Sequence, residues 1–119
     1  MAKDNMQFLQ GVADDDVRTL RDKDVQYGSS WKRRGGVGAF MMMARKWDRI
    51  ETALAPSSLG DECNLSASLV EGEGGAGPYD IFKAVELDPR DEGLLDDIRD
   101  LRRYLLLVES ELLARAAHA

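Results

Sequence analysis

The sequence predicts a small all-α domain, a bundle of about four helices with one long central loop. Apolar residues between 94 and 112 recur at three- and four-residue steps, the spacing of one face of a helix. Residues 37–55 show the same period, and we find no strand-like alternation in the chain. With 119 residues and 44% hydrophobic composition, the chain is long enough for a single core.

The N-terminal part is predicted to be an arm followed by a helix. Residues 1–12 lack clear periodicity, so we expect a flexible arm there and a single helical domain over residues 13–119. Asp14, Asp15 and Asp16 carry the negative charge that the N-terminus of a helix favours. The first helix is expected to continue to Tyr27 and to end at Gly28.

A second helix is predicted from Val37 to Ala55, immediately before Pro56. Its apolar residues form one stripe, which we expect to face the core: Phe40, Met43, Ala44, Trp47, Ile50 and Leu54. Residues 56–77 are rich in Gly and Ser and predict a long mobile loop. A short helix is expected from Pro78 to Leu87.

The last helix is predicted from Asp91 to Ala116 and has two apolar stripes. The first predicts a buried seam formed by Leu94, Ile98, Leu101, Leu105, Val108 and Leu112. The second lies about 100° further round the helix and consists of Leu95, Leu106, Leu113 and Ala117. A helix that is apolar on two sides predicts a partner subunit, so we expect a homo-oligomer formed through this helix.

The composition argues against several classes of partner and metal site. The net charge of −6 argues against binding to long nucleic acids. No apolar run approaches the roughly 20 residues that span a bilayer, so no membrane partner is expected. The lone Cys63 fits a reducing cytoplasm. Because His118 is the only histidine, any metal is expected to be held by carboxylates, which favours Mg²⁺, Mn²⁺ or Ca²⁺.

A basic, glycine-rich run, Ser29 to Phe40, opens the second helix and is the first candidate site. Backbone N–H groups there can point at an anion, and the basic side chains can bind phosphate. Tyr27 or Trp31 could stack on a base. The run lacks a Walker Gly-Lys-Ser/Thr, so a glycine turn with solvated basic residues is the alternative. The predicted ligand-binding residues also include Lys32, Arg33, Arg34, Gly35, Gly36, Gly38, Arg45, Lys46, Arg49 and Tyr104.

Two pairs of carboxylates form the second candidate site. Asp48 and Glu51 lie three residues apart on the second helix, and Asp97 and Asp100 do so on the last. Facing each other, they could hold one or two Mg²⁺ ions against a pyrophosphate and serve as catalytic groups. The alternative is that these acids form ion pairs with neighbouring arginines, and that the basic and acidic segments simply pair in the fold.

Two blocks resemble a known family. YGSSWKRRGGVGAFMMMARKWDRIE (residues 27–51) and YDIFKAVELDPRDEGLLDDIRDLRRYLLLVE (residues 79–109) resemble the phage and prophage family called nucleotide modification associated domain 1. The blocks cover a little under half of the chain. The resemblance implies nucleotide handling, in the cytoplasm of the host if the protein is phage-encoded.

A second resemblance concerns the carboxylates. Asp97-x-x-Asp100-x-x-x-Tyr104 is similar to the ExxD-x-x-x-Y segment of the MazG-like all-helical nucleotide pyrophosphohydrolases, with Asp48-x-x-Glu51 in place of their earlier ExxE. Asp stands here where the family usually has Glu at both first positions.

Three hypotheses follow. The first is a phage-type protein that binds a small phosphorylated nucleotide, linear or cyclic, for instance to sequester a modified or cyclic signal of host defence. The second is a Mg²⁺-dependent pyrophosphohydrolase. The third is a protein–protein interaction module.

Overall fold

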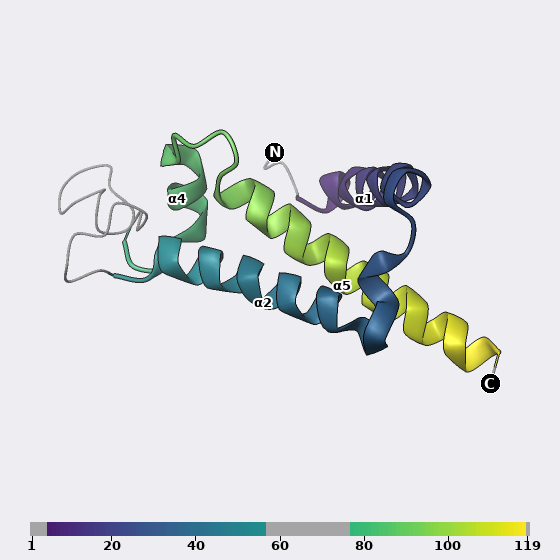
Figure 1. Ribbon diagram of the computed structural model, residues 1–119. Coiled ribbons are helices and arrows are strands. Elements are labelled where there is room, and N and C mark those ends of the chain that lie inside the picture. The colour runs from purple at the N-terminus through teal and green to yellow at the C-terminus, as the bar shows by residue number, and fades with distance from the viewer. Residues whose placement is uncertain (1–4, 57–76, 119) are drawn as a thin grey trace.

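The computed structural model describes residues 5–56 and 77–118, and these two ranges are helical without any strand (Figure 1). The elements are α1 (Met6–Tyr27), the 3-10 helix η1 (Ser30–Lys32), α2 (Arg33–Leu54), α4 (Ile81–Leu87) and α5 (Leu94–Ala117). The predicted all-α class is therefore confirmed. Residues 57–76, which make up most of the predicted loop and include Cys63, lie outside the described residues. Within the described ranges, no helix has the length and apolar character needed to cross a membrane.

Helix α1 begins at Met6, so residues 6–12 of the predicted arm are helical, and residues 1–4 lie outside the described residues. The Asn5 carbonyl accepts a hydrogen bond from the N–H of Phe8 at 2.9 Å, and the helix ends at Gly28. The large apolar side chains of its first turns, Phe8 among them, are exposed. This segment is helical because its Met, Gln and Leu residues favour helices, and not because it packs. It therefore shows no periodicity of the kind that a buried face produces.

A left-handed turn opens α2. Arg34, Gly35 and Gly36 have φ values of 56°, 70° and 79°, so regular right-handed helix starts at about Val37, as predicted. The two glycines adopt this conformation without a Cβ clash, whereas Arg34 adopts it under strain. The turn joins η1 to α2 and fixes the direction in which α2 leaves.

Helices α2 and α5 run antiparallel side by side and form the body of the molecule (Figure 1). The core lies at the end where α2 stops and α5 starts. It consists of Ile50, Ala53, Leu54, Ala84 and Leu94, with Ile81, Val85, Ile98 and Leu101 packed against it. Helix α4 closes this end, and the N–H of Tyr79 donates to the Leu54 carbonyl at 2.9 Å to hold it there.

Acidic side chains set the first residues of α4 and α5. The Asp80 carboxylate accepts the N–H of Lys83 at 3.0 Å, so α4 begins at Ile81 and not at Pro78. The Asp88 carboxylate accepts the N–H of Leu94 at 2.6 Å, so α5 begins three residues later than predicted. A Cβ at Gly93 would lie 2.1 Å from Oδ2 of Asp88, so this close approach requires glycine.

The predicted apolar stripes are buried only in part. On α2 the buried side chains are Ala39, Ile50, Ala53 and Leu54, whereas Phe40 is 63% exposed and Trp47 54% exposed. On α5, Leu94 is buried, but Leu105 and Leu112 are 53% and 62% exposed. Two of the four buried side chains of α2 are alanines, whereas the two aromatic residues of the predicted stripe are exposed. Helix α4 is too short to cover more than one end.

Candidate ligand-binding site

Charged residues attach α1 to α5. Asp16 is buried and accepts hydrogen bonds from Nη2 of Arg102 and Nε of Arg103, both at 2.8 Å. Arg103 also donates to Asp15 at 3.2 Å. The hydrogen bond from Arg102 is the main cause that lowers the pKa of Asp16, while burial opposes it. This group of residues, the Asp16 clamp, holds α1 beside the α2–α5 pair.

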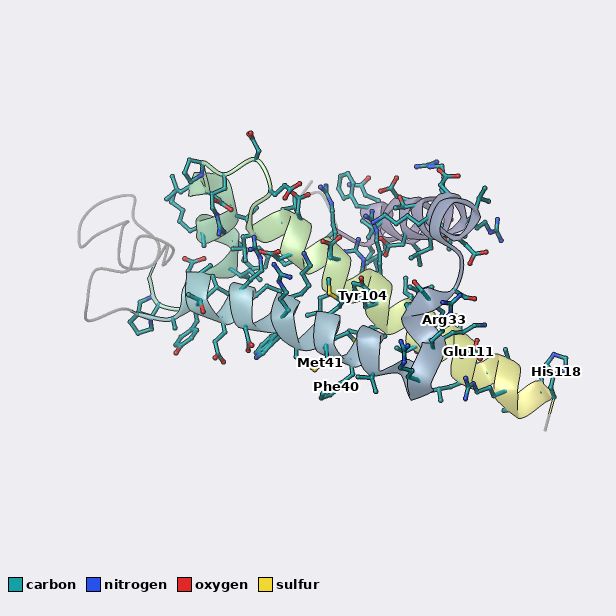
Figure 2. All side chains as sticks on the ribbon, in the orientation of Figure 1. Arg33, Phe40, Met41, Tyr104, Glu111 and His118 are labelled. Atoms are coloured by element: carbon teal, nitrogen blue, oxygen red, sulfur yellow. The ribbon has the colours of Figure 1, made fainter. Side chains whose placement is uncertain are left out.

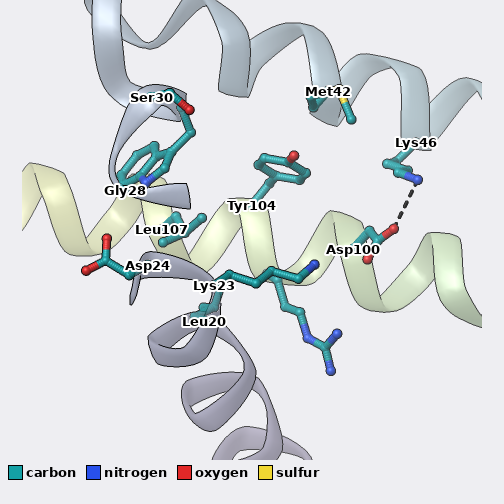
Figure 3. Close-up of a pocket in the computed structure, with 12 residues that line it drawn as sticks. Leu20, Lys23, Asp24, Gly28, Ser30, Met42, Lys46, Asp100, Tyr104 and Leu107 are labelled. Atoms are coloured by element: carbon teal, nitrogen blue, oxygen red, sulfur yellow. Dashed lines mark ion pairs between the residues drawn. The ribbon is translucent and has the colours of Figure 1, made fainter. Parts of the chain in front are cut away.

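A pocket of about 400 Å³ lies between α1, η1, α2 and α5 (Figure 3). Its volume is within the range of small-molecule sites. The apolar part of the wall comes from all four elements, as Leu20, Trp31, Met42, Tyr104 and Leu107. Figure 2 shows Tyr104 between α2 and α1, near the middle of the molecule. Two aromatic rings therefore face one space, which suits a planar aromatic ligand.

The charged part of the pocket wall contains three basic and two acidic side chains. Nζ of Lys46 lies 3.0 Å from Oδ2 of Asp100, the pair drawn dashed in Figure 3. Arg103 is already bound in the Asp16 clamp. Lys23 has no ion-pair partner among the described side chains, and Asp24 is the remaining acid. An anionic group can therefore reach Lys23 without displacing a carboxylate.

A second, strongly polar pocket of about 560 Å³ adjoins the first, and Lys23, Lys46 and Asp100 line both. The other residues that line it are Arg45, Arg49, Glu92, Asp96 and Asp97. Four basic side chains thus face four acidic ones. The basic side chains give this pocket an affinity for anions only where they are not already paired with an acid.

Asp97 is the buried acid of the polar pocket. Its Oδ1 accepts the Nε–H of Arg49 at 2.9 Å and lies 3.7 Å from Nζ of Lys46. Its Oδ2 is buried without a hydrogen-bond partner, which is a costly position for a carboxylate oxygen. The carboxylate is thus compensated on one side only.

Several residues that the sequence singled out come together. Trp31, Lys46 and Tyr104 line the first pocket, and Arg45 and Arg49 join Lys46 in the second. Lys32 bonds to Glu111 at 3.0 Å and lies 5.9 Å from the centre of the Trp31 ring. Tyr27 ends α1, but its side chain lies outside the described part. Leu20, Lys23 and Arg103 were missed, because docking of α1 places them at the pocket and no motif marks them.

Of the glycine-rich run, Ser30 and Trp31 line the first pocket, whereas residues 32–40 line neither pocket. Arg33 and Arg34 are exposed, and no ion-pair partner occurs for them among the described residues (Arg33 is labelled in Figure 2). The run of three left-handed residues differs from the alternating conformation of an anion-binding nest. The backbone of Gly38 passes close to the Trp31 carbonyl, 3.8 Å from where a Cβ would lie. The left-handed turn in this run contributes to the site by joining η1, which carries Trp31, to α2.

The four carboxylates predicted to bind a metal do not lie together in one site. Asp97 and Asp100 line the polar pocket, Asp48 lines a different pocket on α2, and Glu51 is exposed and lines none of these three. Among the described residues no three acid, histidine or cysteine side chains could hold a metal ion together. Comparisons with family models, curated proteins and solved structures find no match for the chain.

Proposed function

We propose that this protein binds a small phosphorylated nucleotide in the pocket of Trp31 and Tyr104. The observation that carries the proposal is that one pocket of about 400 Å³ holds two aromatic rings and Lys23, a lysine with no ion-pair partner among the described residues. A base can stack on either ring, because every base has a π-face, and such stacking contributes about 1–3 kcal/mol per base.

We assign the phosphate of the ligand to the region where the two pockets meet. Lys23 and Lys46 line both pockets there, and Arg45 follows in the second. Lys23 and Arg45 have no ion-pair partner among the described residues, and Lys46 can exchange Asp100 for a phosphate oxygen. Charge-assisted hydrogen bonds from these side chains would orient the ligand and compensate its charge.

Binding without turnover fits the geometry better than hydrolysis. Lys46 and Arg49 form ion pairs with Asp100 and Asp97, the carboxylates that would otherwise be available to a metal ion. Sequestration of a nucleotide needs no such metal. The resemblance to a phage nucleotide-modification family supports the same class of ligand. The proposal extends to a location in the host cytoplasm and to a cyclic or modified nucleotide as the ligand.

The test is a melting-temperature panel of nucleoside mono- and triphosphates and cyclic nucleotides, with and without Mg²⁺. We expect at least one member to raise Tm by several degrees without Mg²⁺, since saturation at 100 times Kd stabilises by about 2.7 kcal/mol. Lys23→Ala should reduce this shift. Arg21→Ala is the matched control, because Arg21 is an exposed cation of the same helix that lines neither pocket.

Other outcomes assign the site elsewhere or reject it. Loss of the shift in the double variant Arg33→Ala, Arg34→Ala, but not in Lys23→Ala, would move the phosphate site to the left-handed turn. Release of pyrophosphate that requires Mg²⁺ would favour the hydrolase hypothesis. The absence of any shift across the panel would reject nucleotide binding.

A further inference from the structure

Large apolar side chains are exposed on both helices of the α2–α5 pair. Phe40 and Trp47 on α2, and Leu105 and Leu112 on α5, are each more than half exposed. All four belong to stripes that have the period of a buried helix face. A face with the composition of a core and the exposure of a surface needs an explanation.

The four side chains share one flank of the pair. On α2, Phe40 and Trp47 lie roughly 130° round the helix from the pocket residues Met42 and Lys46. Figure 2 shows Phe40 on the edge of α2 that points away from α1. These positions place the α2 side chains on the flank opposite the pocket.

The same relation holds on α5. Leu105 and Leu112 lie roughly 140° round the helix from the mean direction of the pocket residues, of which Tyr104 is the nearest at roughly 90°. The other pocket residues of α5 are Asp100, Arg103 and Leu107. Since α1 and the pocket occupy one flank of both helices, the exposed side chains of both helices lie on the other.

The register of the pair brings Phe40 beside the leucine stripe of α5. The ion pair Arg49–Asp97 joins the end of α2 to the start of α5, and counting along both helices from it brings Phe40 close to the level of Leu105. Trp47 lies two turns further along α2 on the same side, and Leu112 lies two turns further along α5. We call the surface of these four side chains the Phe40–Leu112 face.

The size of this face matches half of a dimer interface. If a large apolar side chain has a surface of about 150–250 Å², these four expose roughly 450 Å². A stable interface buries about 800 Å² per partner, of which about 56–65% is apolar. The expected apolar share is therefore roughly 500 Å² per partner.

We propose that the Phe40–Leu112 face binds the same face of a second copy of this chain. A two-fold arrangement of two antiparallel α2–α5 pairs makes a four-helix bundle, and it buries identical surfaces against each other. Among the described residues the only large apolar side chains that are buried are Ile50, Leu54 and Leu94. Burial of the Phe40–Leu112 face against a second copy would add apolar area to this core, and a second copy is present wherever the chain is made.

The first test is the mass in solution by light scattering over a dilution series. We expect about twice the 13.2 kDa of one chain, and a Tm that rises with protein concentration. Phe40→Glu and Leu105→Glu should each shift the mass toward one chain or prevent folding. Phe82→Glu is the matched control, because Phe82 is 82% exposed on α4 and lies outside the face.

The second test needs no disruptive charge. Trp31→Phe leaves Trp47 as the only tryptophan of the chain, and acrylamide should quench its fluorescence weakly in concentrated protein and more strongly on dilution. A single-chain mass at every concentration, or a Trp47 that is equally quenched throughout, overturns the proposal. A dimer that dissociates with Leu106→Glu but not with Phe40→Glu also overturns it, because the interface would then lie on the neighbouring stripe of α5.

Discussion

Arg49 donates its Nε–H to Oδ1 of Asp97 across 2.9 Å, joining two residues to which the sequence assigned different roles. Arg49 was expected to bind phosphate and Asp97 a metal. Their contact shows that the basic and acidic segments pair in the fold for part of their charge. Arg33, Arg34 and Arg45 have no such partner among the described residues, and part of the acidic segment, residues 61–76, lies outside the described residues.

Replacing Arg49 should show how much its ion pair with Asp97 contributes to the free energy of unfolding. Arg49→Met leaves a buried carboxylate with only Lys46 at 3.7 Å, so we expect the free energy of unfolding to fall by about 2 kcal/mol. That figure is below the value for a fully buried pair, because the Arg49 side chain is 40% exposed. Urea unfolding at neutral pH measures the change.

A double-mutant cycle supplies the control. Asp97→Asn removes the charge and retains the shape, so Arg49→Met should cost much less in that background. Equal costs of Arg49→Met in the two backgrounds would show that the pair is not coupled, and the loss would then reflect packing of the Arg49 stem.

The helices could be predicted from the sequence because the 3.6-residue period is a local property. The faces that they bury could not, since burial depends on which side chains let a neighbour approach. On α2 the most deeply buried residues are Ala39 and Ala53, although Phe40 and Trp47 carry the stronger apolar signal. If the second-copy proposal holds, the predicted stripe is a core of the assembly.

Site residues that lie near a recognisable motif could be predicted from the sequence, whereas those brought in by a distant element could not. Trp31 lies three residues before the left-handed turn, Lys46 lies on the helix that follows the turn, and Tyr104 lies one turn beyond Asp100 on α5. Lys23 reaches the pocket only because the Asp16 clamp docks α1, and Asp16 and Arg102 are 86 residues apart in the chain. A polar helix such as α1 gives no sign in its sequence of where it docks.

The Asp16 clamp should make stability depend on pH. The pKa of Asp16 is lowered in the folded state, chiefly by the hydrogen bond from Arg102. A lowered folded pKa contributes stability above the unfolded pKa of about 3.9, and that stability is lost as pH falls through the folded value. Asp16→Asn should therefore reduce the free energy of unfolding at pH 7 by about 1–3 kcal/mol, with a smaller difference from the wild type near pH 2.

Asp22→Asn is the control for the clamp, because Asp22 is exposed on the same helix and has no ion-pair partner among the described residues. Its urea-unfolding curves should follow the wild type at every pH. Because α1 supplies Leu20 and Lys23 to the pocket, Asp16→Asn should also weaken any nucleotide-induced shift of Tm. A gap between Asp16→Asn and wild type that stays constant from pH 7 to pH 2 would argue against titration of this carboxyl as the cause.

The same glycine-to-alanine change should alter the free energy of unfolding in opposite directions at two positions. Gly36 has a φ of +79°, where a Cβ is strained although the space around it is open, so Gly36→Ala should lower the free energy of unfolding by about 1–2 kcal/mol. Gly11 lies within α1, and a Cβ there meets no atom within 4 Å. Gly11→Ala should therefore raise the free energy of unfolding, by up to about 1 kcal/mol, through its higher helix propensity. Urea unfolding of both variants separates backbone strain from packing, because neither new methyl group touches a neighbour. If Gly36→Ala proves neutral, the chain tolerates a right-handed turn there, and the positioning of Trp31 does not depend on left-handed geometry.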